Sequence, residues 1–108
     1  MENKDQVCKV IDIYLSIFGN RWNLLILNEL FHGPKRFNEL KRALSPITQA
    51  VLTRHLKLLE DSQVIERTVL PGTPPSVHYA LSKDGYTMIP SMMSSYEWII
   101  QHSPELKD

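Results

Sequence analysis

The chain has 108 residues and a mass of 12.5 kDa, and 43% of its residues are hydrophobic. This size and composition predict one small globular domain with a packed core and little room for a deep substrate cavity. Twelve Lys and Arg residues balance twelve Asp and Glu residues, so the formal net charge is zero and, as a total, does not indicate a nucleic-acid partner.

The single cysteine, Cys8, excludes an internal disulfide framework and any metal site built from several thiolates. One free thiol fits a reducing compartment. Residues 1–6 are polar with no apolar signal core behind them, and no run approaches the roughly 18 apolar residues of a membrane span. We therefore expect a cytoplasmic protein that does not enter membranes.

Apolar spacing in the first part of the chain predicts two helices that build the core. Apolar residues recur at three- and four-residue steps over residues 6–18, which gives a first helix that stops near Gly19. Residues 20–31 are almost continuously apolar and end at Gly33-Pro34, a typical helix stop. A helix that is apolar on most sides is expected at the centre of the core.

Two shorter helices follow. Residues 36–44 carry apolar side chains at helical spacing and end at a Ser-Pro pair. Thr48 is a good N-cap for a second helix over residues 49–59. Two helices joined by so tight a turn predict a helix-turn-helix over about residues 36–60.

The pattern then changes to that of a β-hairpin. Residues 64–70 are rich in β-branched side chains, residues 71–76 are turn-forming, and residues 77–81 alternate with period two. A hairpin wing over about residues 64–81, with a six-residue tip, is the prediction.

A last helix is predicted over about residues 83–102, capped by Ser82 and kinked at Pro90. The whole chain, residues 1–108, is therefore expected to be a single domain of mainly α structure with a small β-hairpin wing. This α+β arrangement is a winged helix-turn-helix.

The zero net charge conceals an uneven distribution along the chain. Between Gly33 and Lys57 there are six basic residues and one acidic residue, Glu39, whereas the other acidic residues lie at the termini, including Glu2 and Asp108, and in the flanks. The basic residues are Lys35, Arg36, Lys41, Arg42, Arg54 and Lys57. Basic side chains gain affinity for duplex DNA by releasing condensed counterions, so the helix-turn-helix is the expected DNA-binding part.

The second helix of this motif has the side chains that base reading requires. Leu52, Leu56 and Leu59 define its buried stripe and leave another face to polar residues. Gln pairs with adenine, Arg with guanine, and Thr offers a hydroxyl or a methyl group. The candidates for contact along this helix are Thr48, Gln49, Thr53, Arg54, His55 and Lys57.

The alternative is that these charges only solvate a helical surface, as most charge runs do. The added hairpin favours DNA, because the winged helix is used mostly for DNA, although a minority of winged helices bind only proteins. A protein-interaction module without sequence-specific DNA binding therefore remains the alternative function.

The chain resembles the HxlR-type winged helix-turn-helix transcriptional regulators of bacteria over nearly its whole length. The matching residues include Cys8, Gly19 to Leu27, Gly33 to Leu40, Ile47-Thr48, Leu52-Thr53, Leu56 to Glu60, Pro74 to Ser82, Gly85, Pro90 and Glu97-Trp98. The resemblance implies a homodimeric DNA-binding regulator, here expected to be a repressor. It also implies dimerisation through the first and last helices and recognition helices on the half-sites of a palindromic operator, about 34 Å apart.

The apolar surface of the last helix is consistent with a dimer. Met88, Met92 and Trp98 are part of more apolar bulk than so small a domain is expected to hide, although such stripes also serve as core. The expected dimer interface consists of Val7, Ile11, Tyr14, Met92, Met93, Tyr96, Ile99 and Ile100.

The chain departs from the family pattern in two places. Gln63 stands where many relatives have glycine, so either a non-glycine residue adopts a left-handed conformation there or the turn differs. Ser76 stands where a basic residue often follows the two prolines, and residues 71–77 contain no Lys or Arg. The wing is then expected to contact the DNA backbone through Thr73, Ser76, His78 or amide groups, with Arg67 as the nearest charge.

Cys8 matches the position at which several relatives sense oxidants or electrophiles. It falls at the start of the first helix, where the helix dipole, Lys4 and Lys9 would favour a thiolate. The alternative is a small buried residue with no chemistry. With no second cysteine, any disulfide must join two subunits or a small thiol.

The residues indicate neither a metal nor a cofactor nor an enzyme. The four histidines are more than twenty residues apart, unlike metal-ligand pairs, and the sequence has no defensible catalytic triad or phosphate loop. We expect a sequence-specific DNA-binding transcriptional regulator. Lys35, Arg36, Lys41 and Arg42 are expected on phosphates, and Gln49, Thr53 and Arg54 on bases.

Overall fold

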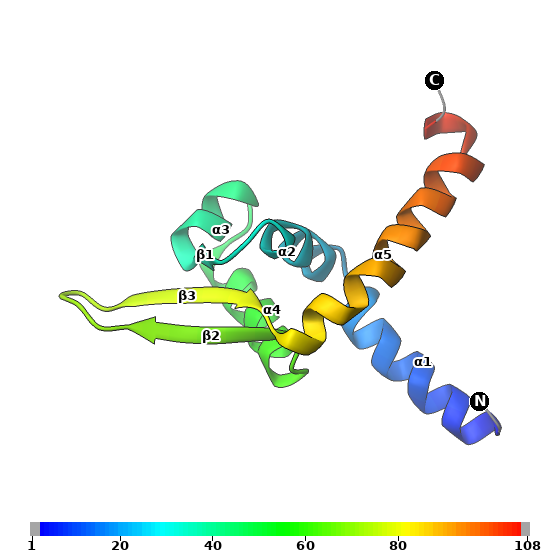
Figure 1. The fold of residues 1–108 in the computed structure, drawn as a ribbon, viewed down its shortest axis with the longest axis horizontal. Coiled ribbons are helices and arrows are strands. Elements are labelled where there is room, and N and C mark those ends of the chain that lie inside the picture. Colours follow the sequence, from blue (N-terminus) through cyan, green and yellow to red (C-terminus); the bar gives the residue numbers. More distant parts are fainter. Residues whose placement is uncertain (1–2, 107–108) are drawn as a thin grey trace.

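The computed structural model describes residues 3–106, so Glu2 and Asp108, two of the terminal acidic residues, lie outside it (Figure 1). The elements in chain order are α1 (Lys4–Phe18), α2 (Arg21–Phe31), β1 (Lys35–Arg36), α3 (Phe37–Ala43), α4 (Gln49–Asp61), β2 (Ile65–Leu70), β3 (Ser76–Leu81), α5 (Lys83–His102) and a short 3-10 helix, η1 (Pro104–Leu106). The predicted winged helix-turn-helix, mainly α with a small wing, is confirmed.

Side-chain caps explain where the helices begin. Asn3 accepts the amide hydrogen of Gln6 at 2.7 Å, and Asn20 accepts that of Trp22 at 2.8 Å. Thr48 caps α4 and Ser82 caps α5, as predicted, through the amides of the third residue beyond each cap. These caps satisfy amides that have no partner within their own helix.

Some boundaries differ from the sequence-based expectations. α1 begins at Lys4, two residues earlier than predicted, because Asn3 supplies the cap. The wing tip has five residues, 71–75, because Ser76 already pairs with Leu70. Two further elements, β1 and η1, were not predicted from the sequence, because β1 has only two residues and η1 only three, too few for a periodicity to show.

The core lies where α2 and α4 cross beneath the sheet. Fully or almost fully buried leucines and isoleucines come from both helices, and β2 and β3 close one side. The core members from these elements are Ile26, Leu27, Leu30, Leu52, Leu56, Leu59, Ile65, Tyr79 and Leu81. Burying one such aliphatic side chain contributes roughly 1.5–3 kcal/mol, so this cluster fixes α4 firmly on α2.

The three strands form an antiparallel sheet in the order β1-β3-β2. Arg36 lies opposite His78, and His78 lies opposite Thr68, so these three side chains share one face of the sheet. Lys35 and Arg67 both lie opposite Tyr79, on the other face. Neighbouring basic residues of β1 therefore point in opposite directions.

The end of α4 and the start of α5 are packed closely against each other. Gln63 has φ 64°, so a non-glycine residue does adopt the left-handed conformation. The Ser82 hydroxyl donates to the carbonyl of Gln63 at 2.7 Å and accepts the amide hydrogen of Gly85 at 2.9 Å. A side chain on Gly85 would overlap the carbonyl oxygen of Val64, so the two segments are in direct contact.

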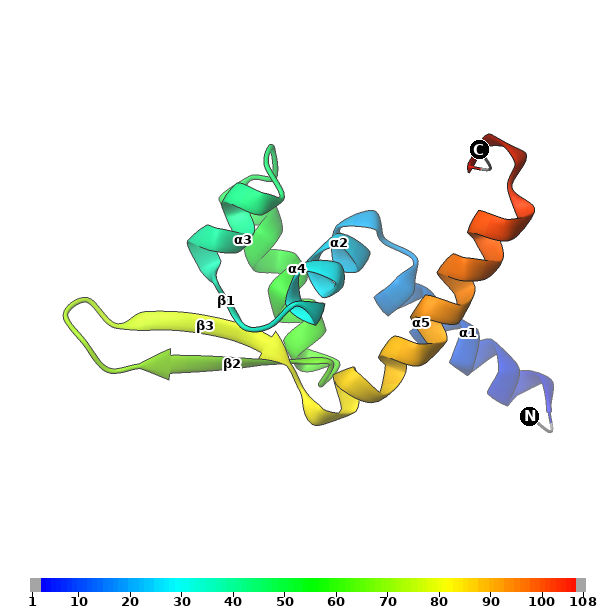
Figure 2. The same ribbon diagram turned by 45° about the horizontal axis from the view of Figure 1, so that its top comes forward.

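The terminal helices project from the body on the side opposite the wing (Figures 1 and 2). In both views α5, which contains Pro90, curves along its length. None of the residues of α1 is buried. Among the described residues no single helix is long and apolar enough to cross a membrane, and α1 and α2 reach that length and composition only as a pair bent by 67°.

Candidate nucleic-acid interface

The exposed face of α4 presents the predicted base-reading residues together. Gln49, Thr53 and Arg54 are all exposed, and Thr48 precedes them at the capped end of the helix. The opposite face carries Leu52, Leu56 and Leu59 and packs on the core. A helix so mounted can present its first two turns to another molecule without disturbing the fold.

His55 lies on the wrong face for a DNA contact, and its prediction as one was wrong. The side chain is only 7% exposed, and its Nδ1 lies 2.8 Å from Oδ1 of Asn23 in α2. Burial, and to a smaller extent the positive charge of Arg54, lowers the pKa of His55. Position 55 falls beside Leu52, Leu56 and Leu59 on the helix, so it faces the core.

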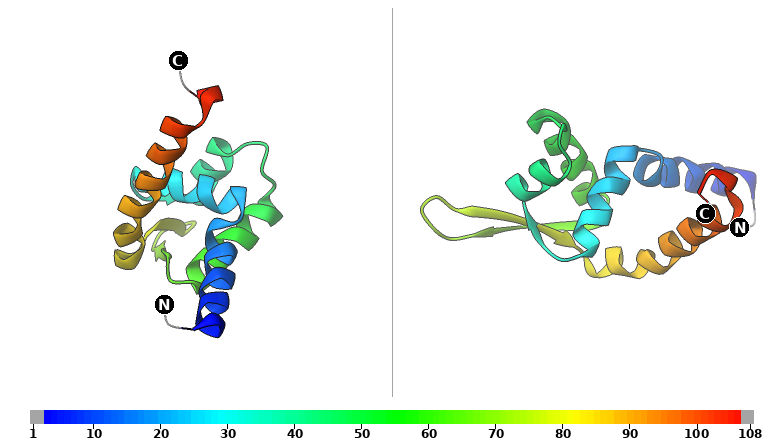
Figure 3. Two further views of the ribbon diagram at one scale, coloured as in Figure 1. Left: turned by 90° about the vertical axis from the view of Figure 1, so that its right-hand side faces the viewer. Right: turned by 90° about the horizontal axis from the view of Figure 1, so that it is seen from above.

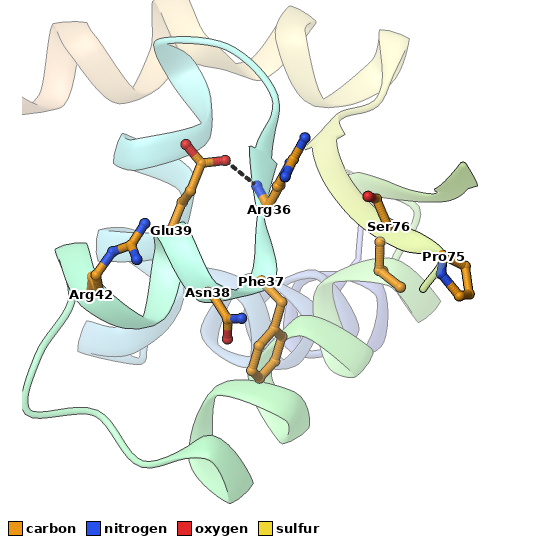
Figure 4. A pocket seen from close by; sticks show the side chains of 8 residues that line it. Arg36, Phe37, Asn38, Glu39, Arg42, Pro75 and Ser76 are labelled. Carbon is orange, nitrogen blue, oxygen red and sulfur yellow. Dashed lines mark hydrogen bonds between the residues drawn. The ribbon is translucent and has the colours of Figure 1, made fainter. Parts of the chain in front are cut away.

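A groove of about 800 Å³ separates the start of α3 from the wing (Figure 4). Its lining residues are Arg36, Phe37, Asn38, Glu39, Arg42, Pro75, Ser76 and Val77. Both of the predicted phosphate-binding arginines, Arg36 and Arg42, therefore share one groove with Ser76 of the wing. Asn38, a polar side chain not predicted as a DNA contact, also lies here.

Glu39 is tied into the backbone at this groove. Its carboxylate accepts the amide hydrogen of Arg36 at 2.9 Å, and Figure 4 shows this bond. That bond, reinforced by the nearby positive charges of Lys35, Arg36 and Arg42, lowers the pKa of Glu39. Glu39 thus caps α3 and orients the backbone that carries Arg36.

The other predicted basic residues differ in their availability. Lys41 is exposed on α3, and Lys35 is half-buried in β1. Lys57 forms an ion pair with Asp61 at 2.9 Å, one helical turn further along α4, and this partner raises the pKa of Lys57. Both side chains of this pair are exposed, so the pair is labile in water.

The wing candidates do not share one face. Ser76 and His78 alternate with Val77 and lie on the face of Arg36, whereas Arg67 lies on the opposite face beside Tyr79. Thr73 is exposed in the tip. His78 is half-buried, and its Nε2 is buried with no hydrogen-bond partner among the described residues.

Cys8 is exposed, which contradicts the alternative of a small buried residue within the chain. It is the fifth residue of α1 and not, as expected, at the start of the helix, because the helix begins at Lys4. Its amide therefore lies beyond the four free amides of the helix end. Among residues 3–106 no three His, Cys, Asp or Glu side chains gather as a metal site would require.

Most of the predicted dimer residues are exposed in the single chain. Ile11 and Tyr14 of α1 are about half exposed, as are Ile99 and Ile100 of α5, and Met93 is 42% exposed. Val7 and Tyr96 are half-buried, and Met92 is buried at 9% exposure, so Met92 also belongs to the core of the single chain. Exposed apolar side chains in this number exceed what scattered surface residues explain.

The family model described as HxlR-like helix-turn-helix matches residues 17–107. The chain belongs to the HxlR-like family. YodB, an HTH-type transcriptional regulator of Bacillus subtilis, is 37% identical over 95 residues, which is 88% of this chain and 85% of YodB. An uncharacterized HTH-type regulator of Methanothermobacter thermautotrophicus is 38% identical over 91% of this chain and 74% of its own length.

Solved structures of similar regulators agree with this assignment. The reduced form of YodB has a TM-score of 0.80 at 36% identity and covers 90% of this chain and 94% of its own. The redox regulator HypR in its oxidized form has a TM-score of 0.76 at 33% identity, with 85% of this chain and 95% of its own covered. This HxlR-like chain is thus a transcriptional regulator, a non-enzymatic class of protein.

Proposed function

We propose that this HxlR-like protein is a repressor that binds a specific sequence in duplex DNA as a homodimer. The observation that carries the proposal is the exposed polar face of α4, held by an apolar core beside a groove that contains two arginines. Residues 1–108 act as one winged helix-turn-helix unit. The bound protein lowers transcription by competing with the transcription machinery for the same DNA.

Base reading is assigned to Gln49, Thr53 and Arg54, because their side chains are exposed on one helix that fits the major groove. Phosphate contacts are assigned to Lys35, Arg36, Lys41 and Arg42. Thr48, at the start of α4, and Lys57, further along the same helix and released from Asp61 on binding, add to them. The wing adds contacts to the DNA backbone through Ser76, Thr73 and His78 or, from its other face, through Arg67.

The homodimer is proposed to form through α1 and α5. The exposed residues Ile11, Tyr14, Met93, Ile99 and Ile100 lose contact with water when a second copy covers them. The rest of the proposed interface consists of Val7, Tyr96 and Met92. A twofold dimer presents two copies of α4 and therefore requires a palindromic operator.

Cys8 is proposed to make this regulator sensitive to oxidants or electrophiles. Its thiol is exposed, and the relatives include a redox regulator, HypR. In an oxidation by diamide, two thiols lose two electrons and two protons to the diazene bond and form one disulfide. Here the second thiol must come from another copy of the chain or from a small thiol.

Selection of bound duplexes from a random pool tests DNA binding, palindromic symmetry and half-site spacing together. We expect one enriched palindrome, bound with an affinity that falls steeply with salt, because several phosphate contacts release counterions. Absence of enrichment, or an affinity insensitive to salt, would favour a protein-interaction module instead.

A further inference from the structure

A buried series of hydrogen bonds links α1 to α4 across α2. Asn23 of α2 has no exposed surface. Its amide nitrogen donates to the carbonyl oxygens of Ser16 and Ile17, in the last turn of α1, at 3.2 and 3.0 Å. Its Oδ1 lies 2.8 Å from Nδ1 of His55 in α4.

The donors and acceptors in this series of hydrogen bonds have a single consistent assignment. The two hydrogens of the Asn23 amide are used by the two carbonyls of α1, so Oδ1 must accept and Nδ1 of His55 must donate. Burial lowers the pKa of His55, so the ring is neutral at neutral pH and carries its proton on Nδ1. A neutral amide and a neutral ring then satisfy each other without any buried charge.

The position of this link gives it a consequence for α4. His55 is adjacent to Arg54 and two residues from Thr53, so it lies within one turn of the exposed face. The neighbouring contacts of α4, through Leu52, Leu56 and Leu59, hold the helix on α2 by apolar burial, which is not directional. A hydrogen bond is directional, and buried polar pairs are best attested as devices that fix register.

We propose that Asn23 and His55 are positioning residues that set the orientation of α4 relative to α1, and through α1 the separation of the two recognition helices in the dimer. This inference rests on the proposed function. Neither side chain touches DNA; both act through the helix on which Gln49, Thr53 and Arg54 are mounted.

The test removes the hydrogen bond and keeps the packing. In Asn23→Leu/His55→Leu both members of the Asn23–His55 pair become apolar groups of similar size, and the carbonyls of Ser16 and Ile17 lose the donor that Asn23 supplied. The matched control is Asn28→Leu/His32→Leu, because Asn28 and His32 are exposed on and just beyond α2. Circular dichroism and thermal unfolding verify that both variants are folded.

Binding is measured on the selected palindrome and on versions with one base pair inserted or deleted between the half-sites. One base pair shifts a half-site by about 3.4 Å and rotates it by about 35°. We expect wild type and control to lose affinity by about tenfold or more on the altered spacings, and the double variant by less than about threefold. An equal loss in all three proteins overturns the positioning role while leaving the proposed function intact; no binding by wild type to any duplex overturns the proposed function and this inference together.

A second measurement needs no DNA and no variant that folds poorly. Nitrogen-15 spectra of the histidine rings of the wild-type chain report which ring nitrogen carries the proton. We expect the Nδ1-protonated form for His55, with that ring proton protected from exchange. A ring protonated on Nε2 would overturn the link, because Nδ1 would then have no hydrogen to donate to Asn23.

Discussion

Replacing Gln63 by glycine is expected to stabilise the protein. Gln63 has φ 64°, and its side chain is exposed and makes no hydrogen bond to any of residues 3–106. A side chain in the left-handed region costs roughly 1–2 kcal/mol, which glycine does not incur. Glycine also gives the unfolded chain extra freedom, which offsets roughly 0.5–1 kcal/mol of the gain. The net expectation is about 0.5–1 kcal/mol of added stability.

Thermal and urea unfolding at one fixed protein concentration measure this change. For a chain of this size the gain corresponds to a rise in Tm of a few degrees, about 2–6 °C. Gln63→Ala is the matched control, because it removes the same side-chain atoms beyond Cβ but retains the strain. If Gln63→Gly is no more stable than Gln63→Ala, the left-handed strain assigned to this turn is refuted.

Three further changes test the interface and its surroundings. Arg54→Ala should relax base preference at one operator position by roughly 1–3 kcal/mol, whereas Lys41→Ala should weaken all sequences alike and reduce the salt slope by about one; equal effects in a selection and a salt titration would contradict this division. Cys8→Ser should abolish the response of operator binding to diamide, and an unchanged response would exclude the thiol as the sensor. Glu39 has a lowered pKa in the folded chain, so its charge contributes stability above its ordinary value of 4.5, and this contribution is lost as the pH falls through the folded value. Glu39→Gln should therefore be less stable than wild type at pH 7, and the difference should shrink as the pH falls below the ordinary value of 4.5 in denaturant titrations; a constant difference would contradict the bond to Arg36 as its cause.

Periodic segments were predictable from the sequence, and the two shortest elements, β1 and η1, were not. Apolar spacing located α1, α2, α3, α4 and α5, and turn chemistry located the wing. β1 has only two residues and exists because β3 offers it an edge, so its formation depends on a partner far along the chain. The groove between α3 and the wing depends on the same pairing.

The prediction for His55 shows where local reasoning stops. Residue type alone made His55 a candidate for DNA, but its place beside Leu52 and Leu56 on the helix puts it in the core. Helical spacing contained that signal, since position 55 lies one residue before Leu56 and three after Leu52. The partner, Asn23, carried no such signal, because an amide within an apolar run reveals neither its acceptors nor its distant neighbour.

Because α1 has no buried side chains, the operator occupancy of this regulator should depend on the concentration of the protein itself. An isolated helix of fifteen residues is marginal in water, and α1 gains little from packing within its own chain. Its order must then come from a covering surface, which under the proposed assembly is a second copy. Helix formation, association and DNA affinity would therefore rise together with concentration, so that the cell's copy number of the protein itself sets how sharply the operator is occupied.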